Sequence, residues 1–144
     1  MKYFDDFAIG DKIVTRARTV TEADVVNFAS LTGDFHPLHV DAEYAKSTRF
    51  GERIAHGMLV LSVATGLWSP EHLLQWAFIA FYGMERVRFT APVKLGDTLH
   101  VDFEVVEKQD KGNAAGVVNL RQSVMNQRGE TVATCLVKLM IGKK

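Results

Sequence analysis

The segment of residues 31–39, Leu-Thr-Gly-Asp-Phe-His-Pro-Leu-His, carries an acid, Asp34, and an imidazole, His39, five positions apart. In a fully extended chain, at ~3.3 Å per residue, they would lie about 16 Å apart, too far to act on one molecule. Gly33 permits a positive φ, and Pro37 fixes its own φ and cannot continue a helix. We therefore expect this segment to fold back and bring the two side chains together.

Asp34 and His39 are residue types that can share the work of moving a proton. A carboxylate is ordinarily ionised at neutral pH, and an imidazole, with an ordinary pKa of about 6.5, gains or loses its proton in that range. Placed together, such groups can orient one water molecule and titrate as a pair. In the alternative, structural interpretation, Asp34 satisfies the amides of a turn and His39 is a hydrogen-bonded imidazole without a chemical role.

Three helices are expected around this segment. Thr21 can cap a helix, and apolar residues recur at helical spacing over residues 23–31. A shorter helix is predicted over residues 41–47. The run 56–69 is apolar on nearly every side and is closed by Pro70, so it predicts a helix buried in the middle of the protein.

The last third of the chain is expected to form strands. Residues 99–105 alternate apolar and polar side chains, which is typical of a half-buried strand. Further candidate strands are residues 12–20, 86–90, 117–125 and 131–141, the last two joined by a turn-rich link over 126–129. Because helices come early and strands late, an α+β fold is favoured over an alternating parallel sheet.

The composition limits the classes of protein to which this chain can belong. Its 144 residues, 47% of them hydrophobic with charges that balance to zero, predict one domain spanning residues 1–144 and argue against a nucleic-acid partner. The longest apolar run, 58–68, is too short to span a bilayer, and the first residues lack a signal-peptide pattern. The single cysteine, Cys135, excludes an internal disulfide framework. We expect a cytoplasmic protein without a membrane partner.

Two motifs taken together resemble the MaoC-like dehydratases, which include (R)-specific enoyl-CoA hydratases. Residues 32–39, Thr-Gly-Asp-Phe-His-Pro-Leu-His, are followed by Ala-His-Gly-Met at 55–58, and the resemblance extends through 87–93 and 96–99. It implies a hotdog fold, in which an antiparallel sheet wraps around a long central helix. It also implies an acyl-CoA or other acyl-thioester substrate, a homodimer or higher homo-oligomer, and no redox cofactor.

Similarity to the family also implies catalytic roles. Asp34 and His39 would activate a water molecule that adds to a trans-2-enoyl thioester, giving an (R)-3-hydroxyacyl product. Gly57 begins the apolar helix, where unpaired N–H groups and the helix dipole would stabilise negative charge on the thioester oxygen. The cations that could meet the phosphates of CoA are Lys46, Arg49 and Arg53, although each is more simply explained as a solvated surface charge.

Four further residues are expected around the substrate. Thr65 falls where similar hydratases carry a serine that lines the acyl site, and Met58 is expected in the core or along the acyl tunnel. His56 is expected to organise the start of the helix. His36 stands where relatives commonly have asparagine, so it could preserve the loop, change substrate preference or weaken hydration.

Three other functions compete with hydration. Many hotdog thioesterases place a carboxylate on or beside the central helix, whereas residues 57–69 contain no Asp or Glu. A non-catalytic subunit that binds acyl thioesters would keep the fold and lose turnover. A metal site could be imagined on Asp34, His36, His39 and Asp41, but one short loop with a proline inside it does not complete a coordination shell.

Overall fold

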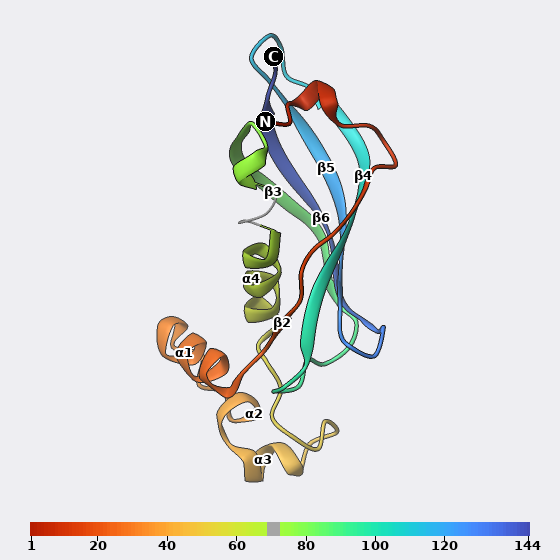
Figure 1. Cartoon of the computed structure of the whole chain (residues 1–144). Helices are drawn as coiled ribbons and strands as arrows, with labels where there is room; N and C mark the ends of the chain where they lie inside the picture. Colours follow the sequence, from red (N-terminus) through yellow and green to blue (C-terminus); the bar gives the residue numbers. More distant parts are fainter. Residues whose placement is uncertain (69–72) are drawn as a thin grey trace.

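The computed structural model describes residues 1–68 and 73–144, and in it a curved antiparallel sheet wraps around one long helix (Figure 1). The helices are α1 (Glu22–Thr32), α2 (Pro37–Val40), α3 (Ala42–Lys46) and α4 (Gly57–Trp68), with 3-10 turns η1 (Phe4–Asp6) and η2 (Leu73–Gln75). The strands are β1 (Lys12–Val14), β2 (Arg18–Thr19), β3 (Phe78–Phe89), β4 (Thr98–Asp110), β5 (Ala115–Met125) and β6 (Thr131–Gly142).

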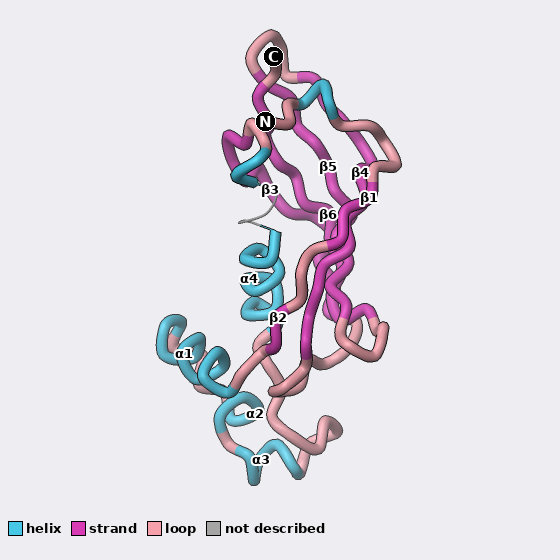
Figure 2. Tube along the Cα trace, in the orientation of Figure 1, coloured by secondary structure: helices cyan, strands magenta, loops and turns pink. Residues whose placement is uncertain are grey.

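The sheet has the order β1-β4-β5-β6-β3, and β2 pairs with the start of β4. Neighbouring strands are antiparallel, and the link over residues 126–129 joins β5 to β6 as a hairpin in which Leu120 lies opposite Val137. Figure 2 shows the strands gathered in one layer, with α1, α2 and α3 together at one end. The predicted α+β arrangement is confirmed.

Helix α4 packs against the sheet because most of its side chains are apolar. Trp68 is 1% exposed, and its ring meets that of Phe103 on β4 edge-on at 5.8 Å between centroids. The prediction of a helix buried on all sides was partly wrong, since Met58 is 61% exposed and Ser62 and Gly66 are exposed as well. These three positions are four apart, so they form one stripe along the helix. One face of α4 is therefore open in the single chain.

The helices before α4 follow local signals in the sequence. The side chain of Thr21 accepts a hydrogen bond from the Asp24 amide, and α1 ends at Gly33 in the left-handed conformation, with φ of 79°. Helix α2 was not predicted. It begins at Pro37 because a proline at the first helical position already has the required φ and needs no amide partner.

Two expected strands differ from the structure. The strand predicted over residues 12–20 is divided into β1 and β2, and β3 begins at Phe78 rather than at residue 86. The predicted end of the central helix at Ser69 and Pro70 lies outside the described residues. Among the described helices, none is long and apolar enough to cross a membrane.

Candidate active site

The predicted acid and imidazole lie together at the end of α4 near α1 and α2. The left-handed turn at Gly33 ends α1 just before Asp34, and α2 then carries His39 back toward it. One carboxylate oxygen of Asp34 and one ring nitrogen each of His39 and His56 lie within 4.8 Å of one another. The expectation that this segment folds back is confirmed.

His39 is held in one tautomer by the backbone. Its Nδ1–H donates to the carbonyl oxygen of Ile54 at 2.8 Å, and a carbonyl can only accept. Burial lowers the pKa of His39 below its ordinary value, although the bond to Ile54 opposes the shift. This shift favours the neutral ring, in which Nε2 offers a lone pair.

His56 supports both of the other groups. It is 3% exposed, and its Nε2–H donates to the backbone oxygen of Asp34 at 3.0 Å. Its ring stacks on that of His39, with centroids 3.8 Å apart and an angle of 26° between the planes. His56 therefore ties the loop before α2 to the first turn of α4 and fixes the plane of the His39 ring.

The same three side chains are a poor fit for a metal ion. A metal bound to imidazole lies close to the ring plane, but the stacked planes of His39 and His56 run side by side and do not converge on one nearby point. Each ring donates one N–H to a backbone carbonyl and keeps its other nitrogen open, so the ring planes, and not the hydrogen bonds, argue against a metal. The arrangement is better suited to holding a water molecule or a substrate oxygen.

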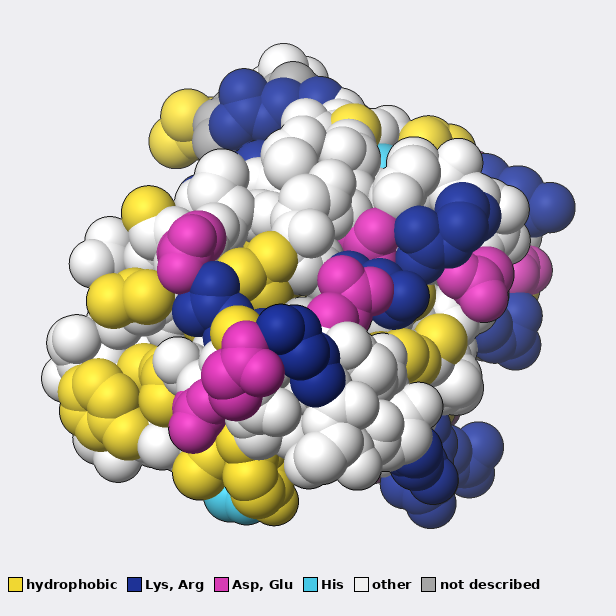
Figure 3. Space-filling view, turned by 90° about the horizontal axis from the view of Figure 1, so that it is seen from below, with side chains coloured by type: hydrophobic (Ala, Val, Ile, Leu, Met, Phe, Trp, Pro, Cys, Tyr) yellow, Lys and Arg dark blue, Asp and Glu magenta, His cyan; other side chains and the backbone are white. Residues whose placement is uncertain are grey.

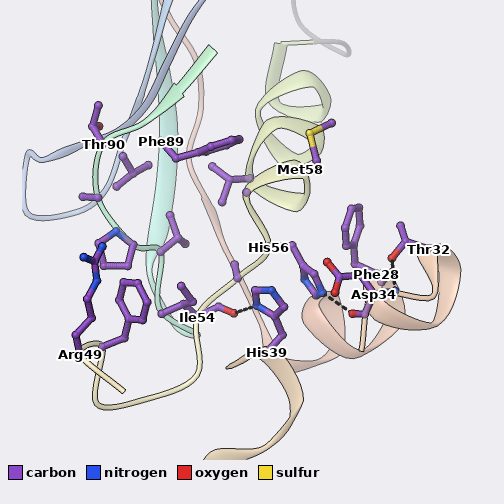
Figure 4. A pocket seen from close by; sticks show the side chains of 18 residues that line it. Phe28, Thr32, Asp34, His39, Arg49, Ile54, His56, Met58, Phe89 and Thr90 are labelled. Atoms are coloured by element: carbon purple, nitrogen blue, oxygen red, sulfur yellow. Dashed lines mark hydrogen bonds between the residues drawn. The ribbon is translucent and has the colours of Figure 1, made fainter. Parts of the chain in front are cut away.

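A cavity of about 590 Å³ opens beside these groups (Figure 4). Its wall includes Asp34, His39, the first residues of α4 and the end of β3. The ring of Phe89 lies so close to Gly57 that a Cβ on this glycine would sit 2.8 Å from its Cζ. Because the first amides of a helix have no carbonyl partner within it, the Gly57 N–H needs an acceptor from outside α4, at a wall that a larger residue would crowd.

Two predicted substrate-binding residues, His36 and Thr65, are not among the described residues that line this cavity. The Nδ1 of His36 accepts a hydrogen bond from the Leu38 amide at 3.1 Å and caps α2. The hydroxyl of Thr65 donates to the Leu61 carbonyl, one turn earlier in α4, at 3.0 Å. His36 thus contributes a cap to α2, and a substrate contact for either residue stays a prediction.

Other cavity residues were missed by the sequence-based reasoning. Phe28 from α1 packs against the ring of His56, with 4.9 Å between centroids, and Phe89 covers Gly57 from the end of β3. The helical spacing of Phe28 indicated a buried position and nothing more. Phe89 meets Gly57 across 32 residues of chain, and no local pattern reports such a contact.

Comparison with known proteins identifies the family. A model of the MaoC like domain matches residues 6–126. The chain belongs to this family. Protein MaoC of Klebsiella aerogenes is 47% identical over 110 residues, which make up 76% of this chain and 32% of that protein. This chain therefore spans about a third of the length of that relative.

Two solved structures are similar along nearly the whole chain. A monoamine oxidase regulatory protein from Archaeoglobus fulgidus shares 50% identity, with a TM-score of 0.93 over 99% of this chain and 95% of that one. The R-hydratase PhaJ1 from Pseudomonas aeruginosa shares 33% identity, with a TM-score of 0.80 over 99% of this chain and 86% of that one. These similarities confirm the hotdog fold. They also show that the MaoC-like chain has homologues among the R-hydratases.

Proposed function

We propose that this MaoC-like chain is a hydratase and dehydratase that adds water to a trans-2-enoyl thioester, a CoA ester, and gives the (R)-3-hydroxyacyl thioester. One observation carries the proposal. The Asp34 carboxylate and a ring nitrogen of His39 lie close together at a cavity that Gly57, the first residue of α4, also lines. The R configuration is proposed from the R-hydratase homologues.

The first step is the capture of water. The carboxylate of Asp34 and the Nε2 of neutral His39 are both acceptors, so together they can hold the two hydrogens of one water molecule. This leaves an oxygen lone pair directed at C3 of the enoyl group. As the O–C3 bond forms, the Asp34–His39 pair takes one proton, and it then returns a proton to C2. The pair ends the cycle as it began, and dehydration runs through the same steps in reverse.

The reaction also requires stabilisation of the negative charge that develops on the thioester oxygen. Attack at C3 moves the π electrons of the double bond toward the thioester oxygen. The Gly57 amide at the first turn of α4 offers a donor and the positive end of the helix dipole. Removing one such donor from an enzyme typically costs about 3 kcal/mol in the barrier. This contact would be strongest in the transition state and would therefore raise the rate.

A single assay separates this function from its rivals. The purified protein is incubated with crotonyl-CoA, and enoyl absorbance and free thiol are followed together. Loss of absorbance without thiol supports hydration, and chiral chromatography should then find the R product. Release of thiol would show a thioesterase instead. Binding without either change would show an accessory subunit.

The activity is expected to fall on the acid side of neutrality because His39 must be neutral to accept a proton. Burial disfavours the charged ring, so its pKa lies below the ordinary value of about 6.5. The expected profile of log kcat/KM is flat from pH 7 to 8 and turns down only below pH 6.5. Initial rates with crotonyl-CoA at constant ionic strength measure it. An acid limb with its midpoint above 6.5 would contradict the assigned state of His39.

We propose in addition that two copies of this domain, residues 1–144, associate along β3. This strand ends the sheet, pairs with β6 on one side, and has the exposed apolar side chains Ile79, Phe81 and Tyr82. A long apolar edge strand is unusual unless another chain covers it. Light scattering after gel filtration should give twice the mass of the chain, and Phe81→Lys should shift the mass toward one copy. A monomeric wild type at micromolar concentration would contradict the association.

A further inference from the structure

The cavity has a cationic end opposite its reactive groups. Arg49 is the one lysine or arginine among the described residues that line it. In Figure 4, Arg49 lies on one side of the cavity, and Asp34, His39 and His56 lie on the other. A substrate that places its reacting carbons at Asp34 and His39 can therefore extend a remote part toward Arg49.

Neighbouring cations differ from Arg49 because they are neutralised. Lys46 pairs with Glu43 at 2.6 Å, Arg53 pairs with Glu22 at 2.5 Å, and Lys94 pairs with Glu52 at 2.5 Å. Figure 3, which views the molecule from the end that carries α1, α2 and α3, shows basic and acidic side chains side by side on this face. Among the ion pairs of the described residues, none involves Arg49. Its charge is available to a ligand.

The Arg49 guanidinium is also oriented before any ligand arrives. It lies over the ring of Phe50, with Cζ 4.9 Å from the ring centroid. A guanidinium held over an aromatic face can still present an N–H edge to a second partner. That edge can bind a phosphate through two parallel hydrogen bonds. In Figure 4, Ile54 lies between Arg49 and His39, and the cavity wall also includes the apolar side chain of Val93. Apolar walls of this kind suit an uncharged linker.

We propose that Arg49 binds the phosphate at the end of the pantetheine arm of the thioester substrate. This inference rests on the proposed function. A pantetheine arm is long and uncharged between its sulfur and its 4′-phosphate, which matches an apolar passage with a cation at its far end. The 4′-phosphate is common to CoA and to acyl carrier protein, and both carriers would use the same contact.

The test compares thioesters that differ only beyond the pantetheine arm. Wild type and Arg49→Gln are assayed for hydration of crotonyl-CoA, crotonyl-phosphopantetheine and crotonyl-pantetheine. For the two phosphate-bearing substrates, Arg49→Gln should raise KM about 10-fold, because it removes one charge-assisted contact to the phosphate. Because the phosphate does not change during the reaction, kcat should stay the same. For crotonyl-pantetheine, KM and kcat should both match wild type.

Two further variants control for charge and geometry. Lys111→Gln removes one exposed positive charge between β4 and β5, outside the cavity lining, and it should leave all three KM values unchanged. Arg49→Lys keeps the charge without the planar fork, so it should restore part of the affinity for crotonyl-CoA. Crotonyl-acyl carrier protein forms the last arm. The carrier with the higher wild-type kcat/KM is the one that supplies the phosphate. Arg49→Gln should reduce kcat/KM for crotonyl-CoA and for crotonyl-acyl carrier protein by a similar factor.

The possible failures are distinguishable. An equal rise in KM with and without the phosphate, or no rise with crotonyl-CoA, would overturn the role of Arg49 while hydration itself stands. A wild type that hydrates none of the thioesters, although its circular dichroism and thermal unfolding show a folded protein, would overturn the proposed function and this inference together.

Discussion

Asp34→Asn is expected to lower kcat for crotonyl-CoA hydration about 100- to 10,000-fold, the range typical for loss of an acid–base group. An amide oxygen can still accept a hydrogen bond from the His36 amide, as one carboxylate oxygen does at 3.2 Å. The loop should therefore keep its shape, while the side chain can no longer take a proton. Steady-state rates at pH 7.5 measure the loss, and the thermal unfolding midpoint reports whether the fold is intact.

A matched control for Asp34 lies in the same part of the chain. Asp41 caps α3 by accepting a hydrogen bond from the Tyr44 amide at 2.9 Å, and it does not line the cavity. Because asparagine caps helices about as well as aspartate, Asp41→Asn should keep the wild-type rate. A folded Asp34→Asn variant with wild-type turnover would remove Asp34 from the mechanism.

His39→Ala is expected to reduce kcat by a similar factor, because it removes the Nε2 that shares the water molecule. The substitution also leaves the Ile54 carbonyl without its donor and the ring of His56 without its stacking partner. The free energy of unfolding should fall by about 1–2 kcal/mol for that reason. Urea unfolding and steady-state rates, measured on the same preparation, separate the two effects.

Chemical rescue of His39→Ala distinguishes a catalytic role of the imidazole from a structural one. Added imidazole can enter the space left by the side chain and should restore part of the rate in proportion to its concentration. His100→Ala is the control, because His100 is half-buried on β4 outside the cavity lining, and its rate should stay at the wild-type level. A folded His39→Ala protein with an unchanged rate would show that the imidazole does no chemistry.

Local signals in the sequence were enough to predict the frame of the site. The cap at Thr21 and the left-handed turn at Gly33 involve residues within one or two turns of each other, so their types alone predicted where α1 begins and ends. The same holds for the hairpin between β5 and β6. The convergence of Asp34 and His39 could also be inferred, because a glycine and a proline between neighbouring segments force the chain to turn.

Contacts between distant segments could not be predicted in this way. The ring of Phe89 over Gly57 joins the end of β3 to the start of α4, and the stacking of His56 on His39 depends on how α4 meets α2. Pairing of that kind is decided by the packing of the whole chain. The position of Thr65 shows the same limit, because helical spacing gives a face but does not say whether a cavity lies beside it.

The exposed stripe on α4 has a related explanation. A run of apolar residues indicates that a helix will be covered, but it does not say by what. Met58 is 61% exposed in the single chain, while the opposite side of α4 is buried against the sheet. The proposed association of two copies would account for an apolar helix that its own sheet covers only in part.

A crystal structure of the Asp34→Asn variant with (R)-3-hydroxybutyryl-CoA tests the central claim most directly. The account predicts that the 3-hydroxyl lies about 2.6–3.2 Å from both the substituted side chain and the Nε2 of His39. It also predicts that the thioester oxygen accepts a hydrogen bond from the Gly57 amide. A bound thioester whose hydroxyl faces away from His39, or whose carbonyl is held elsewhere, would contradict it.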